Sequence, residues 1–118
     1  MEILIPACAG VDIHKKFVIA CRRRRTPDGR TEQETRRFST MTQDLEALVA
    51  WLHEWQCTDL AMESTGVYWL PLFNLLEGHL TVWLVNAQHV KQVPGRKTDV
   101  KDAEWLAQLL QHGLLKPS

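Results

Sequence analysis

Apolar and polar side chains alternate along the N-terminal part of the chain with the two-residue period of β-strands. This pattern predicts strands at Ala7–His14, Phe17–Arg22 and Glu32–Phe38. A Pro-Asp-Gly turn lies between the second and third segments and is typical of a chain reversal. In the first segment, Val11 and Ile13 share one face while Asp12 lies on the other. We therefore expect an antiparallel meander of three strands.

Further along the chain, the apolar positions recur at the spacing of a helix, which is predicted to begin at Thr42 with Thr42 as its cap. Short apolar segments then alternate with helical ones. We predict a strand at Thr58–Ser64, a helix at Val67–Glu77, a strand at Leu80–Asn86 and a last helix from Thr98 to Gly113. Pro71 within the second helix indicates a kink or a later helix start.

The resulting order of elements is βββ-α-β-α-β-α, which predicts an α/β fold with a mixed five-stranded sheet of the ribonuclease H-like type. Strands that are separated by helices pair most simply in parallel, through right-handed crossovers. The same order is compatible with other α/β sheets, so it does not define a function by itself.

Composition and charge narrow the class of protein. The 118 residues are 45% hydrophobic, which suits one domain with its own core. The formal net charge is zero, so the chain is not a uniformly basic nucleic-acid binder, although basic residues cluster locally, as in the run Arg22–Arg25. Three scattered cysteines indicate neither a disulfide framework nor a zinc site, and they favour a reducing cytoplasm. No apolar stretch is long enough to cross a membrane.

Four carboxylates are candidates for a shared site. Asp12 lies within a strand, where Asp is depleted, and Glu63 ends the fourth strand, at the edge where α/β sheets bind ligands. Asp99 and Asp102 are three residues apart on one helix face. If the first and fourth strands are adjacent, the four side chains can converge, and Mg²⁺ or Mn²⁺ would offset their repulsion. Two such ions suit phosphodiester chemistry.

Each carboxylate also has a purely structural explanation. Asp99 can stabilise a helix N-terminus, and Glu63 can cap the turn into the next helix. Asp102 can pair with Lys101 or Arg96 on the surface. Asp12 can accept hydrogen bonds from the neighbouring hairpin. The residues taken alone therefore leave both a metal site and these structural roles open.

Three motifs carry a resemblance to a known family. They are "GVDIHKK" at Gly10–Lys16, "MESTGVYW" at Met62–Trp69 and "GRKTDVKDAEWLAQLL" at Gly95–Leu110. In this order they resemble the N-terminal, RuvC-like domain of the DEDD insertion-sequence transposases, whose relatives include pilin-gene inversion recombinases and bridge-RNA-guided recombinases. The resemblance covers nearly the whole chain.

The resemblance implies a site and a reaction. The family's DEDD tetrad maps onto Asp12, Glu63, Asp99 and Asp102, which would bind Mg²⁺, with Mn²⁺ as a substitute. The reaction would be the cutting and rejoining of DNA during transposition or inversion, guided in some members by an RNA that the element encodes. Residues 1–118 would form a single domain, followed by a C-terminal domain with a nucleophilic serine. The whole protein would be cytoplasmic and is expected to be a homo-oligomer.

Basic residues beside the carboxylates are candidates for contacts with nucleic-acid phosphates. These residues are Lys15, Lys16, Arg96, Lys97 and Lys101. Each of them can equally be solvated surface. His14 shares a strand face with Asp12, so it is also a candidate to line the site. Alternate residues of Arg22–Arg25 would point to opposite faces of a strand, so not all four can touch one partner.

The aromatic residues have simpler roles in this interpretation. Tyr68 lies in an apolar run, so we expect core packing for it. Trp51 and Trp55 are four residues apart on one helix and could pack against another domain or a second copy. Two other functions stay open: a stand-alone junction resolvase or ribonuclease, and a non-catalytic module that binds nucleic acid or dimerises.

Overall fold

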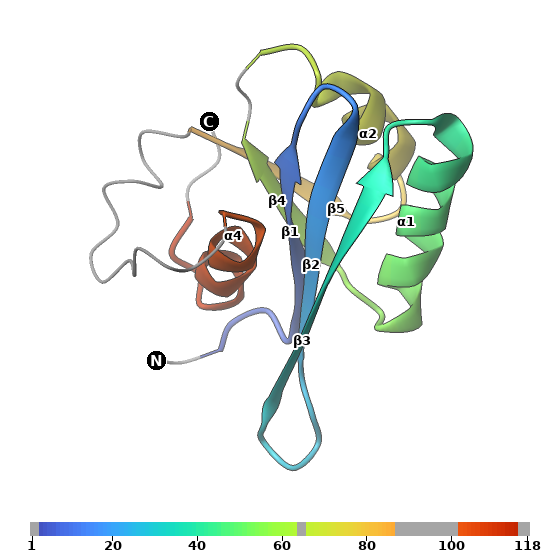
Figure 1. The fold of residues 1–118 in the computed structure, drawn as a ribbon. Coiled ribbons are helices and arrows are strands. Elements are labelled where there is room, and N and C mark those ends of the chain that lie inside the picture. The colour runs from blue at the N-terminus through green and yellow to red at the C-terminus, as the bar shows by residue number, and fades with distance from the viewer. Residues whose placement is uncertain (1–2, 64–65, 87–101, 116–118) are drawn as a thin grey trace.

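The computed structural model describes residues 3–63, 66–86 and 102–115. The described strands form one five-stranded sheet in the order β3-β2-β1-β4-β5. The strands are β1 (Ala7–Ile13), β2 (Phe17–Arg25), β3 (Thr31–Ser39), β4 (Asp59–Glu63) and β5 (Thr81–Val85). The helices are α1 (Thr42–Glu54), α2 (Leu70–Leu76) and α4 (Asp102–Gln111). Figure 1 shows this arrangement.

The pairing of the strands confirms the predicted mixed sheet. β2 pairs antiparallel with both β1 and β3, while β4 pairs parallel with β1 and β5. β2 and β3 extend further than predicted, to Arg25 and from Thr31, and a tight turn joins them, in which the Thr26 backbone N–H donates to the Arg30 carbonyl at 2.8 Å. The central position of β1 places Asp12 between the antiparallel strand β2 and the parallel strand β4.

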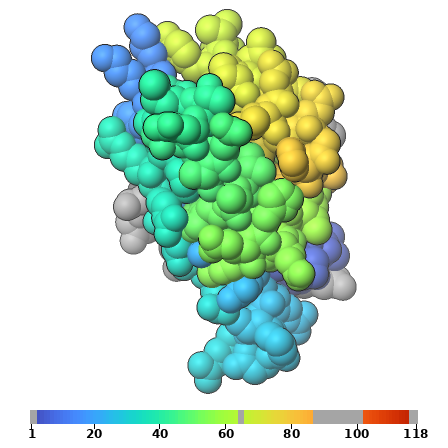
Figure 2. Space-filling view, turned by 90° about the vertical axis from the view of Figure 1, so that its right-hand side faces the viewer, coloured from blue at the N-terminus to red at the C-terminus, as the bar shows by residue number. Residues whose placement is uncertain are grey.

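Helices cover both faces of the sheet. α1 and α2 lie on one face, and α4 lies on the other (Figure 1). We call these the α1 face and the α4 face. The α1 face holds the larger core cluster, in which Val11, Leu48, Leu60 and Met62 are fully buried. Figure 2 views the protein from the side of α1 and α2, with the β2–β3 hairpin projecting below them. Val11 packs on the α1 face, and successive strand residues point to opposite faces, so Asp12 lies on the α4 face.

Gly10 allows α4 to lie directly on the sheet. A Cβ atom at this position would be 2.3 Å from the carbonyl oxygen of Ala103 and 2.6 Å from the backbone nitrogen of Ala107. Any larger side chain would force the helix away from β1, because both of these neighbours are backbone atoms. Gly10 thus places the first turn of α4 over β1, two positions before Asp12 and on the same face of the strand.

Two helix starts differ from the prediction. The N-cap of α1 is Met41 rather than Thr42, and no side chain caps the helix; the Ser39 hydroxyl accepts a hydrogen bond from the Met41 N–H instead. α2 begins at Leu70 rather than Val67, with proline in its first turn, since proline fits the first turn of a helix and not its interior. Gly113 follows α4 with φ of 70°, as the prediction of a glycine stop requires.

Candidate active site

Asp12 and Glu63 occupy equivalent positions on two neighbouring parallel strands. The register pairs Val11 of β1 with Met62 of β4. Asp12 directly follows Val11, and Glu63 directly follows Met62. Gly10 and Ala61, two positions earlier in the same register, both contact the α4 side of the sheet. Because side chains alternate along a strand, Asp12 and Glu63 face the same way. Both side chains are half-buried.

The direction of α4 places Asp102 near the same end of the sheet. The C-terminal part of the helix lies against the segment before β1, where the Gln111 carbonyl accepts hydrogen bonds from the N–H groups of Leu4 and Ile5. Its first turn lies over Gly10. The helix therefore runs antiparallel to β1, and its N-terminus, which begins with Asp102, is directed to the end of β1 that carries Asp12.

The third and fourth members of the predicted site are only partly described. Asp99 lies outside the described residues, as do Arg96, Lys97 and Lys101. Within the ranges 3–63, 66–86 and 102–115, no group of three or more His, Cys, Asp or Glu side chains is placed to hold a metal ion. The donor chemistry nevertheless fits a hard cation, since carboxylate oxygens are the ligands that Mg²⁺ and Mn²⁺ prefer.

His14 contacts Asp12 directly. Its Nε2 lies 2.9 Å from the Asp12 Oδ2, and the two side chains are 44% and 32% exposed. The imidazole also stacks on Phe17, with ring centroids 4.4 Å apart and planes inclined by 20°. These two contacts hold one Asp12 oxygen and the imidazole in a defined orientation. That His14 lines a metal site stays a prediction.

Lys15 and Lys16 form the exposed turn between β1 and β2. The turn is tied to the end of β3, because the Thr40 N–H donates to the Lys16 carbonyl at 3.3 Å and the Thr40 hydroxyl donates to the Lys15 carbonyl at 3.4 Å. Both ammonium groups are therefore carried on an anchored turn next to His14. Their contact with phosphates stays a prediction.

The arginine run is divided between the two faces, as predicted. Arg22 is 5% exposed and donates to the Trp51 carbonyl at 2.7 Å and to Glu54 at 3.0 Å. Arg23 points the other way and donates to Gln111 on α4. Arg24 returns to the α1 face. These three arginines therefore hold helices onto the sheet.

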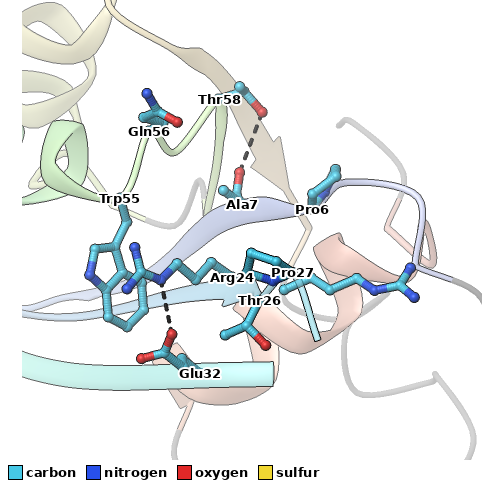
Figure 3. Close-up of a pocket in the computed structure, with 10 residues that line it drawn as sticks. Pro6, Ala7, Arg24, Thr26, Pro27, Glu32, Trp55, Gln56 and Thr58 are labelled. Carbon is cyan, nitrogen blue, oxygen red and sulfur yellow. Dashed lines mark hydrogen bonds and ion pairs between the residues drawn. The ribbon is translucent and has the colours of Figure 1, made fainter. Parts of the chain in front are cut away.

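Arg24 lies in a surface pocket below α1, which Figure 3 shows. Its guanidinium carbon is 4.3 Å from the centroid of the Trp55 ring, and its Nε donates to Glu32 at 3.3 Å. A glutamate that is already paired to the guanidinium and a ring that covers it leave Arg24 a structural role.

Two predictions for aromatic residues are wrong. Trp51 is 2% exposed and belongs to the core, where Arg22 lies 4.4 Å from its ring centroid, so it does not form an external packing seam. Tyr68 is 48% exposed and does not pack in the core. The cause is the late start of α2, which leaves Val67 and Tyr68 in the connection before the helix.

All three cysteines are free and buried. Burial raises the pKa of the Cys21 and Cys57 thiols to about 11, and burial likewise raises the pKa of Cys8. Neutral thiols in an apolar setting are poor nucleophiles and poor metal ligands. The cysteines are therefore packing residues.

Sequence reasoning did not single out Phe17 and Arg37. Phe17 lies on β2 and Arg37 on β3, and the Arg37 guanidinium carbon is 3.9 Å from the centroid of the Phe17 ring. The period of the strands indicates which face each residue occupies, but the pairing register of β2 and β3 was needed to bring the two side chains together.

Sheet order, helix placement and the two strand-end carboxylates together define a ribonuclease H-like domain. The fold is similar to that of the Thermus thermophilus RuvC structure, with a TM-score of 0.63 and 13% sequence identity over 95% of this chain and 99% of that chain. At this identity the likeness establishes the fold alone.

The family is established by the sequence. Residues 9–118 match the IS110-type DEDD transposase family, described as a transposase, and the chain belongs to this family. No curated protein matches the chain. Among the described residues, no helix is both long and apolar enough to span a membrane.

Proposed function

We propose that this chain is the metal-dependent DNA-cleaving domain of a DEDD transposase, with Asp12, Glu63, Asp99 and Asp102 as its metal ligands. The observation that carries the proposal is the placement of Asp12 and Glu63 side by side at the ends of β1 and β4, with the N-terminus of α4 directed to them. Membership of the transposase family supports the reaction.

Each residue of the candidate site has a separate role in this proposal. The four carboxylates bind the cation, and His14 orients Asp12 through its contact with Oδ2. When bound, a divalent cation supplies Lewis-acid stabilisation of the charge that develops on the cleaved phosphate. Lys15 and Lys16 bind phosphates from the anchored turn, and Arg96, Lys97 and Lys101 do so from the segment before α4.

Further partners would complete the reaction. DNA is the substrate, a C-terminal domain supplies a serine nucleophile, and the whole protein acts as a homo-oligomer, with a guide RNA selecting its target. Residues 1–118 then form the RuvC-like domain of that protein. The zero net charge of the chain favours such partners, because further basic surface is needed to hold a polyanion.

The test is a calorimetric titration of the chain with Mn²⁺, beside Asp12→Ala and Asp99→Ala. Both substitutions should abolish binding, and each should lower cleavage of element-end DNA by about a thousandfold in the full-length protein. Asp59→Asn is the matched control. Asp59 lies on β4 at the opposite end from Glu63 and accepts a hydrogen bond from the Trp83 indole at 2.8 Å, so this variant should bind Mn²⁺ normally.

Other outcomes would change the assignment. Loss of binding in Asp12→Ala alone would remove Asp99 from the ligand set. Equal binding by Asp12→Ala and the parent chain would refute the site. Cleavage of a branched DNA junction by the isolated chain would indicate a stand-alone nuclease instead.

A further inference from the structure

A column of three side chains crosses the sheet beside Asp12. The His14 and Phe17 rings stack with their centroids 4.4 Å apart, and the Arg37 guanidinium lies 3.9 Å from the Phe17 centroid. His14 directly follows β1, Phe17 begins β2, and Arg37 lies in the last part of β3. We call His14, Phe17 and Arg37 the stacked platform.

The stacked platform lies on the α4 face. Arg37 pairs in register with Ile19, and Ile19 packs against the buried cluster that Cys21 forms with Ala103 and Ala107 of α4. Phe17 is two residues before Ile19 on the same strand, so it shares this face. The platform thus extends from the Asp12–His14 contact across β2 to β3, on the face to which Asp12 and Glu63 also belong.

Arg37 differs from most of the other described arginines in its charge balance. Arg22, Arg24 and Arg36 pair with glutamates of β3, and Arg30 pairs with Asp28 of the hairpin turn. Arg23 donates to two glutamines. Arg37 is exposed, and no described carboxylate lies within ion-pair distance of it. An exposed guanidinium with an unneutralised charge is suited to bind an anion from solution.

We propose that the stacked platform is a phosphate-binding site for the DNA strand that enters the carboxylate site, with Arg37 as the phosphate ligand. The inference rests on the proposed function and adds a substrate contact to it. A guanidinium can donate two hydrogen bonds to one phosphate. Phe17 restricts its rotamers beforehand, which lowers the entropy cost of binding. Contacts of this type set the position of the strand and carry no sequence preference.

Arg36 offers a matched control on the adjacent position. Its side chain belongs to the α1 face, where it pairs with Glu34 at 3.6 Å and lies 5.2 Å from the Trp51 centroid. The two arginines share a strand and both are exposed. They differ in the face that they occupy and in whether a carboxylate neutralises them.

The experiment compares Arg37→Gln with Arg36→Gln by fluorescence anisotropy, using labelled element-end DNA and an unrelated duplex over a series of salt concentrations. Arg37→Gln should weaken binding to both DNAs about tenfold and should reduce the slope of log affinity against log salt by about one. Arg36→Gln should leave both quantities unchanged. Phe17→Leu should weaken binding by a smaller factor with an unchanged slope, because the charge remains and only its orientation is lost.

The outcomes separate this inference from the proposed function. An unchanged salt slope in Arg37→Gln, or equal losses in the two arginine variants, would overturn the platform while Mn²⁺ binding still reported on the carboxylates. A reduced slope in Arg37→Gln would support the platform even if Asp12→Ala retained Mn²⁺ binding, and in that case the metal site would be the part that fails. Thermal unfolding of each variant verifies that it is folded.

Discussion

Two arginine–aromatic clusters lie on opposite faces of the same sheet. On the α1 face, Arg22 is 5% exposed, lies 4.4 Å and 4.2 Å from the ring centroids of Trp51 and Trp55, and pairs with Glu34 and Glu54. On the α4 face, Arg37 lies over Phe17, is exposed and has no carboxylate partner among the described residues.

Both clusters contain the same type of contact between a guanidinium and an aromatic ring. The burial and the charged neighbours of the guanidinium decide whether it stabilises the fold or is available to a ligand. A buried guanidinium must be paired, because an unpaired charge inside a protein is costly. In Arg22 the pairing uses the charge and both terminal nitrogens of the guanidinium, so this arginine contributes to holding α1 on the sheet. An exposed guanidinium that is only stacked keeps its charge and its donors for a ligand.

Gly10→Ala should destabilise the fold by about 3 kcal/mol, because the new methyl group overlaps backbone atoms of α4. The displaced helix should also expose the cysteines beneath it. Cys8 and Cys21, which pack on the α4 side, should react with a thiol reagent faster than in the parent chain. Cys57, in the core of the α1 face, should stay protected. Thermal unfolding and mass spectrometry of the labelled thiols measure both effects.

Gly29→Ala is the control for this prediction. Gly29 has φ of 86° in the hairpin turn, with no atom within 4 Å of an added Cβ, so only the backbone penalty of about 1 kcal/mol applies. If Cys57 became reactive together with Cys8 in Gly10→Ala, the two faces would unfold as one unit, and the comparison between them would lose its basis.

Arg22→Ala should lower the free energy of unfolding by about 2 kcal/mol, because it removes charge-assisted hydrogen bonds to Glu34, Glu54 and the Trp51 carbonyl. Its affinity for DNA should be unchanged. Denaturant unfolding and DNA anisotropy together check the pair of statements. Arg37→Gln should behave in the opposite way, with a normal stability and a weaker DNA complex.

Arg22→Met tests whether packing or charge matters more on the α1 face. Methionine keeps much of the buried volume, so the loss of stability should be smaller than for alanine. A loss of DNA affinity in either Arg22 variant, at temperatures where it is folded, would contradict the structural role of this arginine.

Glu34→Gln should have the smallest effect, and the effect should depend on pH. The Trp51 indole N–H, and then Arg22, lower the pKa of Glu34 below its ordinary value of 4.5. A lowered folded-state pKa adds stability above pH 4.5, and this stability is lost as the pH falls through the folded-state pKa. The parent chain should therefore be slightly more stable than Glu34→Gln at pH 7, and the difference should vanish on acidification. Unfolding curves over this pH range measure it. A difference that is constant with pH would point to packing.

Local pattern was sufficient for most of the fold. The alternation around Val11 and Ile13 predicts β1 and the face of Asp12, and the order of strands and helices predicts the neighbours of β1, because period and connection handedness are local properties. Pattern was less reliable at helix starts. Proline and capping residues compete there, and Val67 and Tyr68 were placed in a helix that begins only at Leu70.

The three motifs were enough to identify the family and the class of fold, and the carboxylates of these motifs gave the residue types of the candidate site. The contacts of the folded chain were needed to find which residues lie on one face and which are neighbours. It showed that Gly10 is glycine because α4 lies on it, that Arg22 is structural, and that Arg37 reaches Phe17 across the β2–β3 register. The physical reason is that burial and pairing depend on contacts between residues distant in the sequence, which no local period encodes.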